Sequence, residues 1–219
     1  MRLAALAALF ALSPLAARAA EAPKEAPPKA EAPKEEKLAP GSYARLKTPK
    51  GEIVFRLLAD SAPKAVANFA ELAKGERPWK TADGRWVARP FYDGLTFHRV
   101  EDDALKLIQG GCPKGDGTGG PGYRFEDEID DKRKFDKPGV VAMANSGRNT
   151  NGSQFFITLA PAPSLDGRFT IFGEVVRGLE VAEAISKVPA TPKGAGESAI
   201  HMAKEPVPIL SVAIEVVKE

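Results

Sequence analysis

The sequence is poor in the side chains that build most metal centres and covalent catalytic sites. It contains one cysteine, Cys112, so no intramolecular disulfide is possible. Its two histidines, His98 and His201, are too few for a histidine-rich metal site. A hydrolase that uses His98 with a serine is an alternative, but no G-x-S-x-G motif supports it. We therefore expect no metal and no cofactor, and we interpret His98 as a hydrogen-bonded core histidine.

Neither sign of charge predominates. The chain has 31 basic and 29 acidic residues, and removal of a leader containing Arg2 and Arg18 would make the two numbers equal. A neutral protein has no broad electrostatic surface for nucleic acid or an anionic membrane. We expect neither as a partner, and we expect a monomer.

No apolar run is long enough to span a bilayer comfortably. The longest begins at Leu3, directly after Arg2, and ends near Ala16 before a group of small residues. This order of a basic residue, a short apolar run and an A-x-A-like site is typical of a secretory signal peptide. We expect residues 1–20 to be that signal, and the protein to be exported to a Gram-negative periplasm or secreted.

The next segment, 21–40, is rich in proline, glutamate, lysine and alanine. Frequent proline blocks helix formation, and the segment has little to bury, so we expect a disordered linker. The folded domain is expected to be 41–219. Short apolar segments between glycine-rich turns predict a mainly β fold. The expected strands are 43–48, 52–58, 95–100, 107–109, 140–145, 155–159, 169–176 and 209–217. Helices are expected at 61–75, with Ser61 as the N-cap, and at 179–185.

The most informative stretches are 141–147 and 149–157. They combine amide side chains, small turn residues and the aromatic pair Phe155 and Phe156, without acid, thiol, histidine or lysine. Such residues hold peptide groups by hydrogen bonds and an apolar side chain by contact. A second stretch, 90–100, supplies a cation in Arg99.

These stretches resemble the cyclophilins, a family of peptidyl-prolyl cis-trans isomerases. The blocks FYDGLTFHRV, IQGG, GTGGPGY, MANSG, NTNGSQFFIT and LDGRFTIFGEVV occur in the family's order between Ser42 and Val217. The resemblance implies a closed eight-stranded antiparallel β-barrel capped by two α-helices. It also implies isomerisation of proline-containing segments in unfolded or flexible proteins, which for an exported enzyme would be extracytoplasmic proteins.

The resemblance also implies the roles of the site residues. Arg99 would donate to the prolyl nitrogen, Gln109 would orient Arg99, and Phe156 would form the floor of the proline pocket. The expected substrate-binding residues are Lys106, Leu107, Ala144, Asn145, Gln154, Ser164, Leu165 and Phe169. A guanidinium suits this chemistry because it stays charged and can favour the twisted imide, whose nitrogen regains a lone pair.

Three departures from the family pattern bear on the pocket. The segment VEDDALKLI after Arg99 is two residues longer than usual, and Lys106-Leu107 aligns with the usual Phe-Met pair. Ser164 stands where an aromatic often occurs, and Phe169 where many members carry histidine. We expect an active enzyme with an altered pocket and weak or no binding of cyclosporin. The alternative is a catalytically weak, chaperone-like module that binds prolyl peptides.

Overall fold

The computed structural model describes residues 37–103, 105–194 and 200–218. The predicted signal peptide, 1–20, and the predicted linker as far as residue 36 lie outside the described residues. Leu38–Glu219 form one compact unit, which contains every element named below. In this described part of the chain, no helix is both long enough and apolar enough to cross a membrane.

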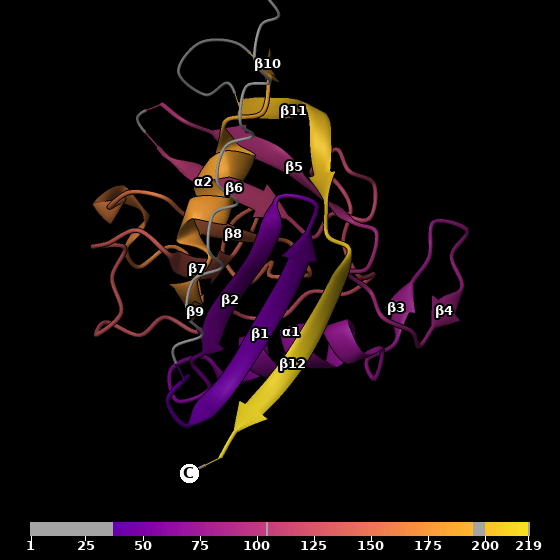
Figure 1. Ribbon diagram of the computed structural model, residues 1–219. Coiled ribbons are helices and arrows are strands. Elements are labelled where there is room, and N and C mark those ends of the chain that lie inside the picture. The colour runs from indigo at the N-terminus through magenta and orange to yellow at the C-terminus, as the bar shows by residue number, and fades with distance from the viewer. Residues whose placement is uncertain (1–36, 104, 195–199, 219) are drawn as a thin grey trace, which may run out of the picture. The chain divides into compact units, whose positions relative to one another are not determined.

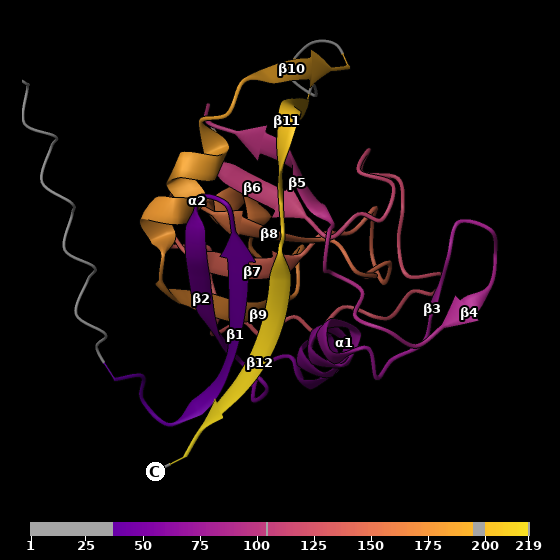
Figure 2. The ribbon, with the colours of Figure 1, turned by 45° about the vertical axis from the view of Figure 1, so that its right-hand side comes forward.

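The unit is mainly β and carries two α-helices (Figures 1 and 2). The first half contains β1 (Gly41–Thr48), β2 (Gly51–Leu57), α1 (Pro63–Lys74), β3 (Trp79–Lys80), β4 (Trp86–Val87), β5 (Thr96–Glu101) and β6 (Leu107–Gly110). The second half contains β7 (Val140–Met143), β8 (Phe155–Thr158), the 3-10 turn η1 (Pro163–Leu165), β9 (Ile171–Arg177), α2 (Leu179–Ser186), β10 (Ala190–Lys193), β11 (Ile200–Pro208) and β12 (Ser211–Val217). All eight predicted strands and both helices are present, and their bounds shift by one or two residues.

The prediction of a closed eight-stranded barrel is wrong. Ten strands form one sheet in the order β10-β11-β5-β6-β8-β7-β9-β2-β1-β12, with all pairs antiparallel and with ends at β10 and β12. The two additional strands, β10 and β11, come from a segment rich in proline and charge, which hid them in the sequence.

The last two strands pair with different neighbours, although they follow one another directly. The Ile209 amide donates to the Leu95 carbonyl beside β5, whereas the Leu210 amide donates to the Lys47 carbonyl of β1. The chain therefore changes partner at one peptide unit, and the sheet curls until β5 and β1 lie along the same segment. Register shifts in β2–β9, β5–β6, β7–β9 and β11–β5 increase this curl.

Aromatic packing fixes α1 against the inner face of the sheet. The ring of Phe69, at the centre of α1, lies 4.7 Å from Tyr92, 5.5 Å from Phe55 and Phe155, and 5.4 Å from Phe172 between ring centroids. These side chains are fully buried. The apolar face of a single helix therefore joins β2, β8, β9 and the segment before β5, and this sets the position of the site strands.

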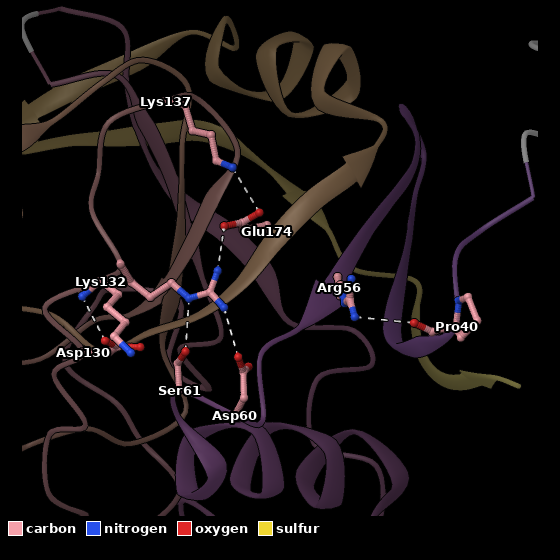
Figure 3. A network of polar contacts seen from close by, with 9 residues as sticks. Pro40, Arg56, Asp60, Ser61, Asp130, Lys132, Lys137 and Glu174 are labelled. Atoms are coloured by element: carbon pink, nitrogen blue, oxygen red, sulfur yellow. Dashed lines mark hydrogen bonds and ion pairs between the residues drawn. The ribbon is translucent and has the colours of Figure 1, made fainter. Parts of the chain in front are cut away.

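The ends of α1 differ in how well the sequence predicted them. Gly75 ends the helix in the left-handed conformation, with φ 77°, as expected. The predicted N-cap, Ser61, is wrong: the N-cap is Ala62, which has no side-chain cap. The Ser61 hydroxyl instead accepts a hydrogen bond from Arg133, which also pairs with Asp60 and Glu174 (Figure 3). This network ties the start of α1 to the loop before β7 and to β9.

The polar insertion after α1 folds as a small hairpin of β3 and β4, which projects from the ten-stranded sheet (Figure 1). Its two tryptophans behave differently. Trp79 is buried, packs edge-on against Phe91 at 5.0 Å and donates from its indole nitrogen to the Arg89 carbonyl. Trp86 is 55% exposed. Trp79 thus anchors the insertion by local packing.

Candidate functional site

A row of directly paired residues crosses four strands of the sheet. Arg99 of β5 pairs with Gln109 of β6, Gln109 pairs with Phe156 of β8, and Phe156 pairs with Ala142 of β7. Directly paired residues on neighbouring strands point to the same face of a sheet. Two strand spacings separate the backbones of Arg99 and Phe156, about 9–10 Å. The structure therefore places the three predicted catalytic residues side by side on one face.

Two hydrogen bonds hold the Arg99 guanidinium. Its Nε donates to Glu101 Oε1 at 2.8 Å, and its Nη1 donates to Gln109 Oε1 at 3.2 Å. Among the described residues nothing accepts a hydrogen bond from Nη2. The side chain is 22% exposed. Arg99 is thus fixed at two of its three nitrogens and keeps the donors of Nη2 free.

The polar contacts continue from Gln109 to a glycine-rich loop. Gln109 Nε2 donates to Gln154 Oε1 at 2.9 Å, and Gln154 Nε2 donates to the carbonyls of Gly117 and Gly119 at 2.9 and 2.8 Å. Because the Gln109 side-chain nitrogen is bonded to Gln154, the Gln109 side-chain oxygen faces Arg99. The contacts agree with the predicted role of Gln109 in orienting the arginine.

An apolar cluster surrounds Phe156 on the same face. Phe135 stacks on the Phe156 ring at 5.8 Å, and Phe169 meets it edge-on at 5.3 Å. The predicted walls Leu107 and Leu165 belong to this cluster, together with Leu105 and the partly buried Ala144. Phe156 is 3% exposed, so only a small part of the ring faces solvent. The cluster offers a shallow apolar surface beside the arginine.

A groove of about 650 Å³ adjoins this row. It is lined in part by Gln109, Ala144, Asn145 and Gln154, all predicted to bind substrate or support catalysis. The Asn145 side chain bonds to the Arg168 carbonyl and the Gly147 amide. Its own backbone amide and carbonyl have no hydrogen-bond partner among the described residues. They are free to pair with an extended peptide.

Two predicted residues do not join the apolar cluster. The Lys106 side chain is exposed and lies 3.8 Å from the Asp102 carboxylate. Ser164 is exposed in η1, where Leu165 alone is buried. Leu105, one residue before Lys106, occupies the cluster instead. In this segment the apolar side chain that precedes Leu107 in the cluster is therefore Leu105 and not residue 106.

Four contributors were not predicted: Glu101, His201, Leu105 and Phe135. Glu101 had a signal in the sequence, because residues two apart in a strand share a face. It lies two positions after Arg99 and bonds to it. His201 and Phe135 had none, since they come from distant segments brought close by the fold.

His98 corrects the sequence prediction in part. It is buried in the core and 1% exposed, as expected, and the Thr96 backbone and the Gln154 side chain interact with its ring, but neither ring nitrogen makes a hydrogen bond of normal geometry within the described structure. Burial lowers the pKa of His98, and the charge of Arg99 acts in the same direction. A neutral, buried imidazole has no access to a substrate proton, so His98 is not a catalytic base.

The assembled chemistry is that of a binding surface with one fixed cation. A guanidinium with free donors, an amide relay, unpaired peptide groups and an apolar ring lie together. Across the described ranges, no group of three or more histidine, cysteine, aspartate and glutamate side chains is placed to hold a metal ion. Such a site can bind an imide and stabilise charge on its nitrogen without covalent chemistry.

Comparison with known proteins agrees with this geometry. A family model described as cyclophilin type peptidyl-prolyl cis-trans isomerase/CLD matches residues 43–213. Peptidyl-prolyl cis-trans isomerase B of Streptomyces anulatus is 49% identical over 154 residues, covering 69% of this chain and 87% of that protein. Peptidyl-prolyl cis-trans isomerase A of Mycobacterium tuberculosis is 50% identical over 147 residues, covering 66% of this chain and 80% of its own.

A solved structure gives the same result for the fold. A cyclophilin type peptidyl-prolyl cis-trans isomerase of Cryptosporidium parvum matches with a TM-score of 0.65 and 32% identity, covering 81% of this chain and 99% of that chain. The same protein was also solved in the presence of the dipeptide Ala-Pro, and that structure matches with a TM-score of 0.63 and 32% identity, covering 80% and 99%. By family model, sequence identity and fold, this chain belongs to the cyclophilin-type peptidyl-prolyl cis-trans isomerases.

Proposed function

We propose that this isomerase lowers the barrier to X-Pro rotation through Arg99, with Phe156 as the contact for the proline ring. Rotation of the bond breaks amide resonance, against a barrier of about 18–20 kcal/mol. In the planar forms the nitrogen lone pair is delocalised into the carbonyl group, whereas in the twisted form it is localised on nitrogen. A donor placed at that nitrogen therefore binds the transition state better than either ground state.

The observation that supports this role is the arrangement of the Arg99 hydrogen bonds. Nε and Nη1 are committed to Glu101 and Gln109, which leaves Nη2 for the substrate. A purely structural role for Arg99 in linking strands would not explain why an apolar ring lies on the same face, two strands away. Phe156 lies in the same row, so one proline could contact the ring while its nitrogen faces the guanidinium.

Peptide on either side of the proline would bind along the groove. The unpaired backbone groups of Asn145 would pair with the substrate backbone, and Gln154 would add a side-chain contact. Ala144 leaves room for the chain because its side chain is small. The Ala-Pro dipeptide used with the Cryptosporidium parvum structure makes Ala-Pro peptides a suitable first substrate.

The pocket departures support weak cyclosporin binding. Ser164 is exposed and brings no apolar wall, and the exposed Lys106 replaces part of the usual pair. Titration with cyclosporin, followed by inhibition of the wild-type enzyme and of Ser164→Trp, tests this proposal. Stronger inhibition of the variant is expected; tight inhibition of the wild type would contradict it.

Export is proposed from the sequence pattern at 1–20 and the proline-rich segment that follows. The clients would then be exported proteins whose folding waits for X-Pro isomerisation. Expression of the full chain in a Gram-negative host, with fractionation and N-terminal sequencing, tests this. A protein that keeps its first 20 residues and stays in the cytoplasm would contradict it.

The assignment of Arg99 is tested by a cis-to-trans exchange assay on a short Ala-Pro peptide. Arg99→Ala should reduce kcat/KM by about 10²- to 10³-fold, the range for removal of one charge-stabilising donor. Phe156→Ala should act mainly on KM. Arg45→Ala is the matched control, because Arg45 also lies on a strand and pairs with Glu52 and Glu215, outside this row.

Each outcome of this assay has a distinct meaning. Full activity of Arg99→Ala would overturn the mechanism while leaving the family assignment intact. A wild-type rate equal to that in buffer, with peptide binding retained, would favour the chaperone-like binding module. A loss of activity in Arg45→Ala equal to that in Arg99→Ala would point to a general loss of structure.

A further inference from the structure

Arg99 is held by a buried carboxylate that has a second partner on another strand. Glu101 lies two residues after Arg99 in β5, and its side chain is only 8% exposed. Its Oε1 accepts from Arg99 Nε at 2.8 Å and from the His201 backbone amide at 3.0 Å. Its Oε2 lies 2.6 Å from His201 Nδ1. Both carboxylate oxygens are therefore occupied by β11 and Arg99.

Burial of a carboxylate is unfavourable unless donors compensate for the lost water. Burial alone would raise the pKa of the Glu101 carboxyl, but the hydrogen bonds from His201 and Arg99 lower this pKa below its ordinary value overall. Glu101 is thus ionised at neutral pH. The fold keeps a charged group at a position where an apolar residue would bury more easily, which indicates a task for the charge.

The task that fits these contacts is to fix the plane of the guanidinium. A single hydrogen bond lets the planar group rotate about the bond, whereas bonds at two different nitrogens fix its plane. Gln109 provides the bond at Nη1 and Glu101 the bond at Nε. Glu101 can do this only if its own side chain is fixed, and the two contacts from His201 do so.

We propose that Glu101, clamped by His201, is a positioning residue that holds Arg99 in the orientation needed for isomerisation. The proposal rests on the proposed role of Arg99. Glu101 and His201 act through Arg99 in this proposal, because Glu101 bonds to Nε and His201 bonds to Glu101, while Nη2 is left for the substrate. The neighbouring acids Asp102 and Asp103 are exposed and take no part.

The sharpest test separates charge from geometry. Glu101→Gln keeps an oxygen that accepts from Arg99 Nε, so kcat should fall only a few-fold. Glu101→Leu removes the acceptor and replaces it with an apolar side chain of similar size. We expect kcat to fall by about 10- to 100-fold, the range for a misplaced catalytic group, with little change in KM. The partial rescue by glutamine is the signature of positioning.

His201→Leu provides a second variant, since the His201 side chain is 33% exposed and the variant should fold because the β11 backbone pairing remains. It should lower kcat, but less than Glu101→Leu. If His201 acts only through Glu101, the double variant Glu101→Leu/His201→Leu should be no slower than Glu101→Leu alone. In both single variants the NMR signal of the Arg99 Nε–H proton should be broader than in the wild type, and this proton should exchange faster with solvent.

The matched control is Glu215→Leu, which removes a carboxylate from Arg45 on β1. It should leave kcat and KM unchanged, and thermal melts of all variants should show that they are folded. An unchanged kcat in Glu101→Leu and His201→Leu, or a rise in KM alone, would overturn the positioning role. Arg99→Ala, measured in the same assay, keeps the two proposals apart. If it is inactive while these variants are normal, only the positioning role fails; if it is fully active, the proposed function fails.

Discussion

Gln154 joins the catalytic row to the glycine-rich loop, and its removal should affect both stability and activity. Three hydrogen bonds would be lost: one from Gln109 and two to the carbonyls of Gly117 and Gly119. At about 0.5–1.5 kcal/mol net for each bond, the sum is about 1.5–4.5 kcal/mol. The lower part of this range applies, because both carbonyls line the groove, where water can replace the amide.

A loss of about 2 kcal/mol corresponds to a fall in Tm of about 4–8 °C for a domain of this size. Gln154→Ala should show this fall in differential scanning calorimetry. Its kcat/KM should drop by about 10-fold, because Gln109 can then turn away from Arg99. Thr118→Ala, on the same loop, is the control: it removes an exposed hydrogen bond to Asp116 and should change neither quantity much.

A second variant, Gln154→Glu, should change in stability with pH in a direction that the contacts of Gln154 determine. A carboxylate at this position would face two carbonyl oxygens, so it should be less stable than Gln154→Ala at pH 7. Protonation restores one donor, which means that the introduced carboxyl has a raised pKa in the folded state. The difference in the free energy of unfolding between Gln154→Glu and Gln154→Ala should therefore shrink as the pH falls. If Gln154→Ala kept the wild-type Tm and kcat/KM, the contacts of Gln154 would contribute neither to stability nor to activity, and the prediction would be wrong.

Two further predictions concern buried positions. Because the pKa of His98 is lowered in the folded state, the unfolded state binds a proton first as the pH falls below about 6.5, so the free energy of unfolding decreases. His98→Leu should flatten this dependence in urea titrations between about pH 5 and 7; an unchanged slope would refute it. Gly111 has φ +82° and its Cβ would lie 2.5 Å from the Ser153 carbonyl, whereas Gly94 has φ +81° and no neighbour within 4 Å. Gly111→Ala should thus lower Tm clearly more than Gly94→Ala, and equal losses would contradict the close approach.

The sequence was sufficient to predict the strands in which apolar and polar residues alternate and the strands that carry blocks of the family pattern. All eight strands expected from apolar runs and turn residues are present, because local pattern and burial agree there. It failed for β10 and β11, whose prolines and charges give no strand signal. Those strands are held by pairing with each other and with β5, contacts that no local pattern encodes.

The same division holds for the site. Arg99, Gln109 and Phe156 could be named from the sequence because each lies within a recognisable block, and β pairing then placed them in one row. The contribution of Leu105 to the apolar cluster was not predicted, and Lys106, which was expected to bind substrate, lies outside the cluster beside Asp102.

The sequence by itself determined the family, the cation and the apolar ring, since these depend on residue type and order along short segments. Only the tertiary structure decided what holds the cation in place. Glu101 and His201 are separated by 100 positions and meet because β11 folds back beside β5. Contacts across such separations follow from strand pairing and sheet curvature, which are properties of the whole chain and not of any segment.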